Sequence, residues 1–231
     1  MEHTESPTPH GRIVSVNVGA GTPRPRAASG RVTGIHKRPV TGPVAVADPG
    51  PRSSTAGSGL AGDVIGDTRH HGGTDQAVYA VALEELKHWG GRLGRALPPG
   101  AFGENLTTAG YDVDGAILGE RWRVGDVELQ VTGPRVPCGT FRTAMGVTGW
   151  LRLFTERGRT GAYLRVLSPG LLRAELPLTV IHRPAHGVTV PVLFRALMGD
   201  AQARARVDAA GEDLSDTARR SLARRSRTAD R

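Results

Sequence analysis

At 231 residues the chain is long enough to bury a core, and its single cysteine excludes an intramolecular disulfide and a multi-cysteine zinc motif. No stretch approaches the roughly 20 apolar residues of a membrane-spanning helix, and the polar N-terminus lacks the apolar segment of a secretory signal. The net charge of +8 is compatible with nucleic acid, but aromatic residues, at 4%, are too sparse to stack on bases. We therefore expect a soluble, cytoplasmic protein without a membrane partner, and rank nucleic-acid binding last among its candidate functions.

The first half of the chain predicts a strand, a long loop and a helix. Residues 1–10 are polar, and we expect them to be disordered. Side chains alternate in type over residues 11–18, as in a strand. Residues 49–59 are rich in Pro, Gly and Ser and predict a surface loop. Apolar residues at helical spacing predict a helix over residues 77–89, with Thr74 as its cap.

The second half returns to strands. Residues 121–131 predict a hairpin that turns at Gly125 and Asp126, and two further β-rich runs follow between residues 161 and 183. Many short strands, 32 glycines and few helices are typical of a mainly β, α+β fold with a barrel-like sheet. Neither of the standard nucleotide-binding loops, GxGxxG or GxxxxGK[ST], is present.

The C-terminal part predicts a small three-helix appendage. Its first helix begins at Thr189 with Pro191 in the first turn, a weaker helix covers residues 201–209, and Ser215 caps a third. The predicted organisation is a disordered N-terminus over 1–10, a β-barrel domain over 11–186, the appendage over 187–225 and a frayed tail over 226–231.

Three polar clusters are candidate ligand sites. Residues 66–78 combine Asp67, Arg69, His70, His71, Gly72, Gly73 and Asp75 ahead of the predicted helix, where glycines and a helix start favour an anion. The alternative is a glycine-rich loop whose histidines are simply solvated. Residues 100–106 offer Glu104 and Asn105, which either face a ligand or satisfy backbone groups of their own turn. Residues 158–166 place Arg159 and Thr160 between two glycines, a second candidate grip for an anion.

Cys138 lies between Arg135 and Arg142 and directly follows Pro137. Cationic neighbours lower the pKa of a thiol and favour the thiolate, which is the form that acts as nucleophile or metal ligand. The alternative is a small buried apolar residue, the commonest state of a free cysteine. The sequence leaves both interpretations open.

In this order, the motifs RHHGGTDQAVYA, GAFGENL, PRVPC and GRTGAYLRVL resemble the MOSC domain family, named for the C-terminal domain of molybdenum cofactor sulfurases, and its YiiM-like subgroup. The resemblance covers about residues 11–225 and includes a three-helix C-terminal extension. It implies a barrel-like domain that binds the molybdenum cofactor (molybdopterin), with Cys138 as the protein ligand to molybdenum. A thiolate suits this metal because the pterin already supplies two sulfur donors.

The resemblance also implies roles for other residues. The candidate catalytic residues are Cys138 and three residues chosen by their places in the motifs: His71 as a proton source, and Asp67 or Glu104 as the residue that holds a proton-donating water. The candidate cofactor-binding residues are Arg69, His70, His71, Gly72, Gly73, Asn105, Arg135, Arg142, Arg159 and Thr160. Two departures from the family pattern, a longer loop at residues 49–59 and GTFR after the cysteine, place the substrate pocket in question more than the cofactor site.

The implied activity is reduction of N-hydroxylated bases and related compounds, a detoxification in which N–OH becomes N–H. One cysteine cannot build an iron–sulfur cluster, so electrons would come from a separate reductase. The alternative is a non-catalytic carrier of the cofactor or of sulfur that works with cofactor-biosynthesis proteins. A homodimer is the candidate assembly.

Overall fold

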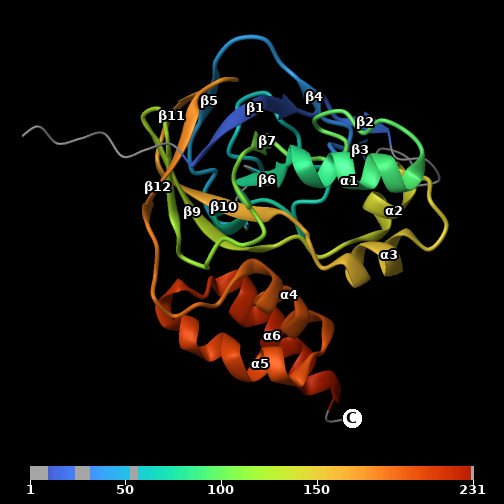
Figure 1. The fold of residues 1–231 in the computed structure, drawn as a ribbon, viewed down its shortest axis with the longest axis vertical. Coiled ribbons are helices and arrows are strands. Elements are labelled where there is room, and N and C mark those ends of the chain that lie inside the picture. Colours follow the sequence, from blue (N-terminus) through green and yellow to red (C-terminus); the bar gives the residue numbers. More distant parts are fainter. Residues whose placement is uncertain (1–9, 24–31, 53–56, 230–231) are drawn as a thin grey trace, which may run out of the picture.

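The computed structural model describes residues 10–23, 32–52 and 57–229. The predicted disorder of the N-terminus therefore falls, except for residue 10, outside the described residues. Within them, seven strands form a closed barrel: β1 (Gly11–Val18), β6 (Val78–Ala82), β7 (Leu106–Ala109), β8 (Arg121–Val124), β9 (Val127–Pro134), β10 (Ala162–Ser168) and β12 (Pro177–His182). Their order is β12-β8-β9-β10-β6-β7-β1, and β1 pairs with β12 to close the ring. The predicted barrel-like α+β fold is confirmed (Figure 1).

Five short strands of the described chain lie outside the barrel: β2 (Thr22–Pro23), β3 (Val32–Thr33), β4 (Arg38–Pro39), β5 (Val44–Val46) and β11 (Gly170–Leu172). Of these, β4 pairs with β1, and β2–β3 and β5–β11 form two separate two-stranded sheets. The β8–β9 hairpin turns at Gly125 and Asp126 as predicted, with Val124 opposite Val127. Side chains on β8 alternate between exposed and buried, which is why the period of two was visible in the sequence.

The predicted helix over residues 77–89 is wrong in its first part. Val78–Ala82 is strand β6, and helix α1 (Leu83–Leu93) begins only after it, while Thr74 starts a short 3₁₀ turn, η1 (Thr74–Gln76). Every residue of β6 is buried, because one face of the strand packs into the barrel core and the other against the aromatic cluster beside the barrel. A continuous apolar run of this kind does not distinguish a central strand from a buried helix. The pair β6–β7 is parallel, and α1 lies in the crossover that such a pair requires.

Helices α1, α2 (Gly139–Met145) and α3 (Trp150–Arg157) enclose an aromatic cluster beside the barrel (Figure 1). The five large rings are Trp89, Phe102, Phe141, Trp150 and Phe154, each at most 1% exposed. They pack edge to face, for example Trp89 on Trp150 with ring centroids 4.6 Å apart. This cluster fixes α2, the helix that follows Cys138.

The C-terminal helices α4 (Val190–Met198), α5 (Ala201–Val207) and α6 (Asp216–Ala229), with the 3₁₀ turn η2 (Asp208–Asp213), form the predicted appendage below the barrel (Figure 1). Ser215 caps α6, and its Oγ accepts from the backbone N of Ala218 at 3.3 Å. The helix continues to Ala229, four residues past its predicted end, and residues 230–231 lie outside the described chain. The apolar side chains of these helices belong to the same buried cluster as the barrel interior, so the appendage shares the barrel's core. None of the helices in the described ranges is long and apolar enough to cross a bilayer.

Candidate functional site

Cys138 lies between the end of β9 and the start of α2, in an extended conformation with φ −130° and ψ 170°. Its thiol is partly buried. Burial raises the pKa of this thiol, but a hydrogen bond with His71 and the positive charge of Arg135 outweigh burial, and the pKa falls from 9.0 to about 6. The sequence left open whether Cys138 is inert or reactive, and this environment favours the reactive thiolate.

Arg135 is the cation that faces the thiol. It is only 6% exposed, and its Nη1 donates to the carbonyl oxygen of Phe102 at 2.5 Å. The guanidinium stacks on the rings of Tyr79 and Phe141, with 5.0 and 4.2 Å to their centroids. No carboxylate of the described residues lies within ion-pair distance of it. Its charge is therefore directed at Cys138 and at the space in front of the thiol.

That space is a pocket of about 670 Å³, including its open mouth, which we call the thiolate pocket. Its polar walls are formed by Lys37, Asp67, His71, Gln76, Asn105 and Arg135, with Cys138 among them. The Oε1 atom of Gln76 is buried and accepts no hydrogen bond from the described residues. An unsatisfied buried acceptor costs free energy unless a ligand donates to it, so this atom points to an occupant with N–H or O–H groups.

A buried ion pair forms another wall of the thiolate pocket. The ammonium of Lys37 contacts Asp63, whose side chain is fully buried. Asp63 also accepts from the Nδ2 of Asn105 at 2.9 Å and from Ser58 at 2.5 Å, and Asn105 in turn accepts from the backbone N of Tyr79 at 3.1 Å. Burial lowers the pKa of Lys37 despite the opposing charge of Asp63. The hydrogen bonds to Asp63 and Tyr79 therefore hold the Asn105 side chain in one orientation at the pocket wall.

Residues 66–73, which we call the glycine loop, bring His71 to Cys138. Its last two residues must be glycine, because a Cβ at either position would clash with the backbone of a neighbouring loop. Gly72 and Gly73 have φ of 79° and 78°. A Cβ on Gly72 would lie 2.2 Å from the carbonyl oxygen of Gly57, and one on Gly73 2.7 Å from the backbone N of Arg52. In the structure these glycines therefore allow contact between two loops, whereas their predicted contact with the cofactor stays a prediction.

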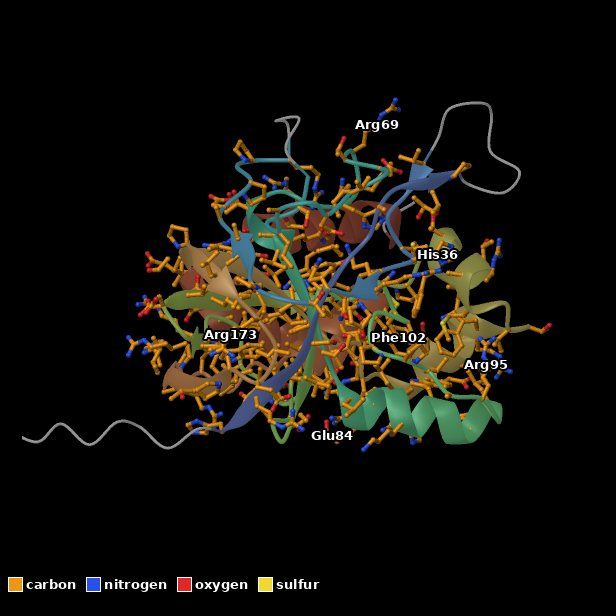
Figure 2. All side chains as sticks on the ribbon, turned by 90° about the horizontal axis from the view of Figure 1, so that it is seen from above. His36, Arg69, Glu84, Arg95, Phe102 and Arg173 are labelled. Atoms are coloured by element: carbon orange, nitrogen blue, oxygen red, sulfur yellow. The ribbon has the colours of Figure 1, made fainter. Side chains whose placement is uncertain are left out.

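The other residues of this loop lie further out. Asp67 lines the thiolate pocket, and its Oδ2 contacts Nδ1 of His70 at 3.1 Å. Burial raises the pKa of Asp67, but the bond to His70 prevails and lowers it. His70 and Arg69 are exposed and border a second pocket, and Arg69 projects from the surface (Figure 2).

Glu104 does not line the thiolate pocket. Its carboxylate is fully buried and accepts from the backbone N of Gly100 at 2.6 Å, the backbone N of Phe102 at 2.9 Å and the hydroxyl of Thr107 at 2.9 Å. Burial raises the pKa of Glu104. Of the two interpretations of this turn, the geometry favours satisfaction of its own backbone over proton transfer to a ligand.

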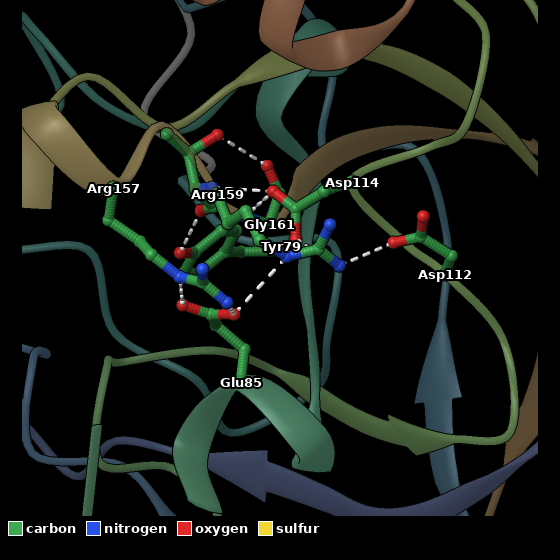
Figure 3. Close-up of polar contacts among 8 residues, drawn as sticks. Tyr79, Glu85, Asp112, Asp114, Arg157, Arg159 and Gly161 are labelled. Atoms are coloured by element: carbon green, nitrogen blue, oxygen red, sulfur yellow. Dashed lines mark hydrogen bonds and ion pairs between the residues drawn. The ribbon is translucent and has the colours of Figure 1, made fainter. Parts of the chain in front are cut away.

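Arg159 and Thr160 also lie away from both pockets, in a separate charged network (Figure 3). Arg159 donates to Glu85 at 3.2 Å and to Asp112 at 2.5 Å, so its guanidinium is engaged by carboxylates of the protein. The backbone N of Thr160 donates to Asp114 at 2.5 Å, and its carbonyl accepts from the hydroxyl of Tyr79 at 2.5 Å. The predicted second grip is thus linked to the thiolate pocket through the hydrogen bond of Tyr79.

Arg142 is exposed on the surface of α2 and does not line either pocket. The structure therefore unites Cys138, His71, Asp67, Asn105 and Arg135. It adds residues that sequence reasoning missed: Lys37, Asp63, Gln76, Tyr79 and Tyr163. Lys37 follows His36 and precedes Arg38, and Asp63 follows Gly62, so nothing in the local sequence marks the two as a buried pair.

Comparison with known proteins identifies the family. The MOSC domain model matches residues 67–179, the part of the chain that contains Cys138 and the glycine loop. The uncharacterized protein YflK of Bacillus subtilis is 32% identical and covers 82% of this chain, with 82% of its own length matched. The chain belongs to the MOSC domain family.

Two further comparisons place this MOSC protein within the family. The crystal structure of YiiM from Geobacillus stearothermophilus superposes with a TM-score of 0.72 at 27% identity, over 93% of this chain and 98% of that one. A protein named Reductase from Gibberella moniliformis is 29% identical over 78% of this chain, and the match covers 31% of that longer protein. The resemblance to YiiM-like MOSC proteins predicted from the four motifs is confirmed.

Proposed function

We propose that this MOSC protein binds the molybdenum cofactor with the Cys138 thiolate as the protein ligand to molybdenum, and that it reduces N-hydroxylated compounds. The observation that carries the proposal is the thiol whose pKa is lowered to about 6, next to a buried arginine at the wall of a pocket. The relative named Reductase supports reductive chemistry.

The residues of the thiolate pocket fit such a cofactor. A thiolate is a soft donor that suits a metal already carrying sulfur ligands. Among the described residues no group of three or more His, Cys, Asp or Glu side chains could hold a bare metal ion, so a metal that brings its own ligands suits the site better. The unsatisfied acceptor of Gln76 matches the N–H groups of a pterin edge. Cys138, His71, Gln76 and Asn105 would hold the group, and Arg135 would balance its charge.

The bound cofactor would supply the two-electron couple that the reaction needs. Reduction of N–OH consumes two electrons and two protons and yields N–H and water. His71 and Asp67 both line the pocket, and Asp67 contacts the exposed His70, so these side chains form the proposed route for protons. Glu104 is not part of this route, because its oxygens are occupied by the turn. The electrons would come from a separate reductase.

Metal and pterin analysis tests the proposal. Protein would be purified from a host that makes the cofactor, comparing wild type, Cys138→Ser and the control Thr143→Ala, an exposed residue on the helix that follows Cys138. We expect stoichiometric molybdenum and pterin in wild type and Thr143→Ala and their loss in Cys138→Ser. Folded wild-type protein free of both would refute the proposal. Loading without turnover of N-hydroxylated substrates by an artificial electron donor would instead indicate the non-catalytic carrier.

A further inference from the structure

The charged network at the start of β10 contains a buried carboxylate to which the proposed function gives no role. Asp114 lies between β7 and β8 and is only 1% exposed. Its Oδ1 accepts from the backbone N of Thr160 at 2.5 Å and from that of Gly161 at 2.9 Å (Figure 3). Its Oδ2 lies 3.7 Å from Arg159 and accepts no hydrogen bond from the described residues. Burial of such a carboxylate costs free energy, and the bonds that offset part of this cost fix the backbone at Thr160 and Gly161.

The side chain of Tyr79 is held by the same stretch of backbone. Its hydroxyl donates to the carbonyl oxygen of Thr160 at 2.5 Å. Burial raises the pKa of Tyr79 well above 10.0, so the hydroxyl keeps the proton that it donates. Gly161 has φ of 68°, and a Cβ there would lie 2.4 Å from the carbonyl oxygen of Ala80 and 3.0 Å from Cε2 of Tyr79. The glycine therefore lets the backbone lie directly against the ring, which is fixed at its edge and at its hydroxyl.

Tyr79 in turn supports the cation that faces the thiol. The guanidinium of Arg135 lies over the Tyr79 ring, 5.0 Å from its centroid, and donates to the carbonyl oxygen of Phe102. No carboxylate of the described residues holds it in an ion pair. Its direction is therefore set by aromatic and carbonyl contacts, and a displaced Tyr79 ring would move the positive charge relative to Cys138.

We propose that Asp114 is a positioning residue of the thiolate pocket, which holds the Arg135 guanidinium toward Cys138 through the Thr160 carbonyl and the Tyr79 ring. Asp114 itself does not line the pocket. The importance of this charge for catalysis rests on the proposed function, in which Arg135 balances the charge of the cofactor. The arrangement of the side chains does not depend on it.

The ratio of two alkylation rates tests the proposal. Iodoacetate is an anion and iodoacetamide is neutral, and each forms a carbon–sulfur bond with the thiolate and loses iodide. At one pH the ratio of their rate constants therefore cancels the thiolate fraction and measures the positive charge near the thiol. Every label reports on Cys138, the only cysteine of the chain. In metal-free protein at low salt we expect Arg135→Gln to lower the ratio about tenfold, which sets the scale for loss of the cation.

The variants of the proposed connection differ in the sign of their effect. Asp114→Ala and Tyr79→Phe should each lower the ratio at least about threefold, whereas Asp114→Asn, which keeps an oxygen for the two backbone donors, should retain it. Loss of a negative charge would by itself raise the preference for the anion, so a fall in Asp114→Ala reports positioning. Asp112→Ala is the matched control, since it removes an exposed carboxylate that contacts Arg159 in the same network, and it should leave the ratio unchanged.

An unchanged ratio in Arg135→Gln or in Tyr79→Phe would overturn the assignment. So would an equal fall in Asp112→Ala, or a fall in Asp114→Asn as large as that in Asp114→Ala. If Asp114→Ala does not fold, Tyr79→Phe decides. Because the protein carries no metal in this assay, the result is independent of molybdenum binding at Cys138, which metal analysis tests separately.

Discussion

Replacing His71 by Ala should raise the pKa of the Cys138 thiol. Burial alone raises that pKa, and the bond with His71 is the largest effect that opposes burial, ahead of the charge of Arg135. A thiol with a pKa of about 6 is about 90% thiolate at pH 7, whereas one at the ordinary value is only about 1% thiolate. Without His71 the pKa of the Cys138 thiol should rise from about 6, although the charge of Arg135 should keep it below 9.0.

Alkylation by iodoacetamide across pH 4–10 measures this midpoint in metal-free protein. Because Cys138 is the only cysteine of the chain, every label incorporated reports on it. The midpoint of the rate against pH is the relevant quantity, since the intrinsic nucleophilicity of a thiolate falls with its pKa. His70→Ala is the matched control, because His70 contacts Asp67 and is not one of the groups that shift the pKa of Cys138. A wild-type midpoint near 9, or equal midpoints in wild type and His71→Ala, would refute the reasoning.

The same shift makes stability depend on pH. The folded thiol has the lower pKa, so between about pH 6 and 9 the unfolded chain binds more protons and the free energy of unfolding rises with pH. The contribution of up to about 4 kcal/mol is complete above the ordinary pKa and is lost as the pH falls through 6. Denaturant titrations of wild type and Cys138→Ser at both ends of this range measure it, and parallel pH profiles of the two proteins would contradict it.

Three substitutions test the structural residues around the site. Glu104→Ala should lower the free energy of unfolding by about 3 kcal/mol, since it leaves buried backbone donors of the turn without an acceptor; a loss below about 0.5 kcal/mol in urea titrations would contradict that role. Gly72→Ala should cost about 2 kcal/mol or more, because its Cβ meets the carbonyl of Gly57, whereas Gly139→Ala, with nothing within 4 Å of the added Cβ, should be nearly neutral in thermal unfolding. Asp75→Asn should destabilise the protein at pH 7 by about 1–2 kcal/mol, and because folding lowers the pKa of Asp75, the difference from wild type should shrink as the pH falls below 3.8. Equal stability of these two proteins at pH 7 would show that the carboxylate is dispensable.

The β8–β9 hairpin was readable from the sequence, and strand β6 was not. In the β8–β9 hairpin, outward residues such as Arg121 and Arg123 meet water, so the polar alternation is written into the chain. In β6 both faces are buried, one in the barrel core and the other against the aromatic cluster, and no charged residue interrupts the run. Helical spacing then fits the same residues as well as a strand does.

At the site, the sequence shows which charged residues lie near Cys138 along the chain, but not which of their side chains point toward the thiol. Arg135 and Arg142 are similarly close to it in sequence, yet one is buried against aromatic rings and the other is exposed on α2. Arg159 looked like an anion grip because its partners Glu85 and Asp112 are 74 and 47 residues away along the chain, and only the fold brings them to it. Sequence spacing carries no information about such neutralising partners.

Contacts between residues far apart in sequence also explain why the sequence suggested an appendage separate from the barrel. Its helical pattern begins cleanly near Thr189, but Asp75, in the turn that follows the glycine loop, accepts from the backbone N of Thr217 at 3.0 Å at the start of α6. Thr132 of β9 donates to the carbonyl of Asp75 at 2.6 Å and accepts from Ser215 at 3.1 Å. The start of α6, the barrel wall and the loop that carries His71 are thus connected by direct hydrogen bonds. The C-terminal helices are therefore anchored to the turn between the glycine loop and β6, although none of their described residues lines the thiolate pocket.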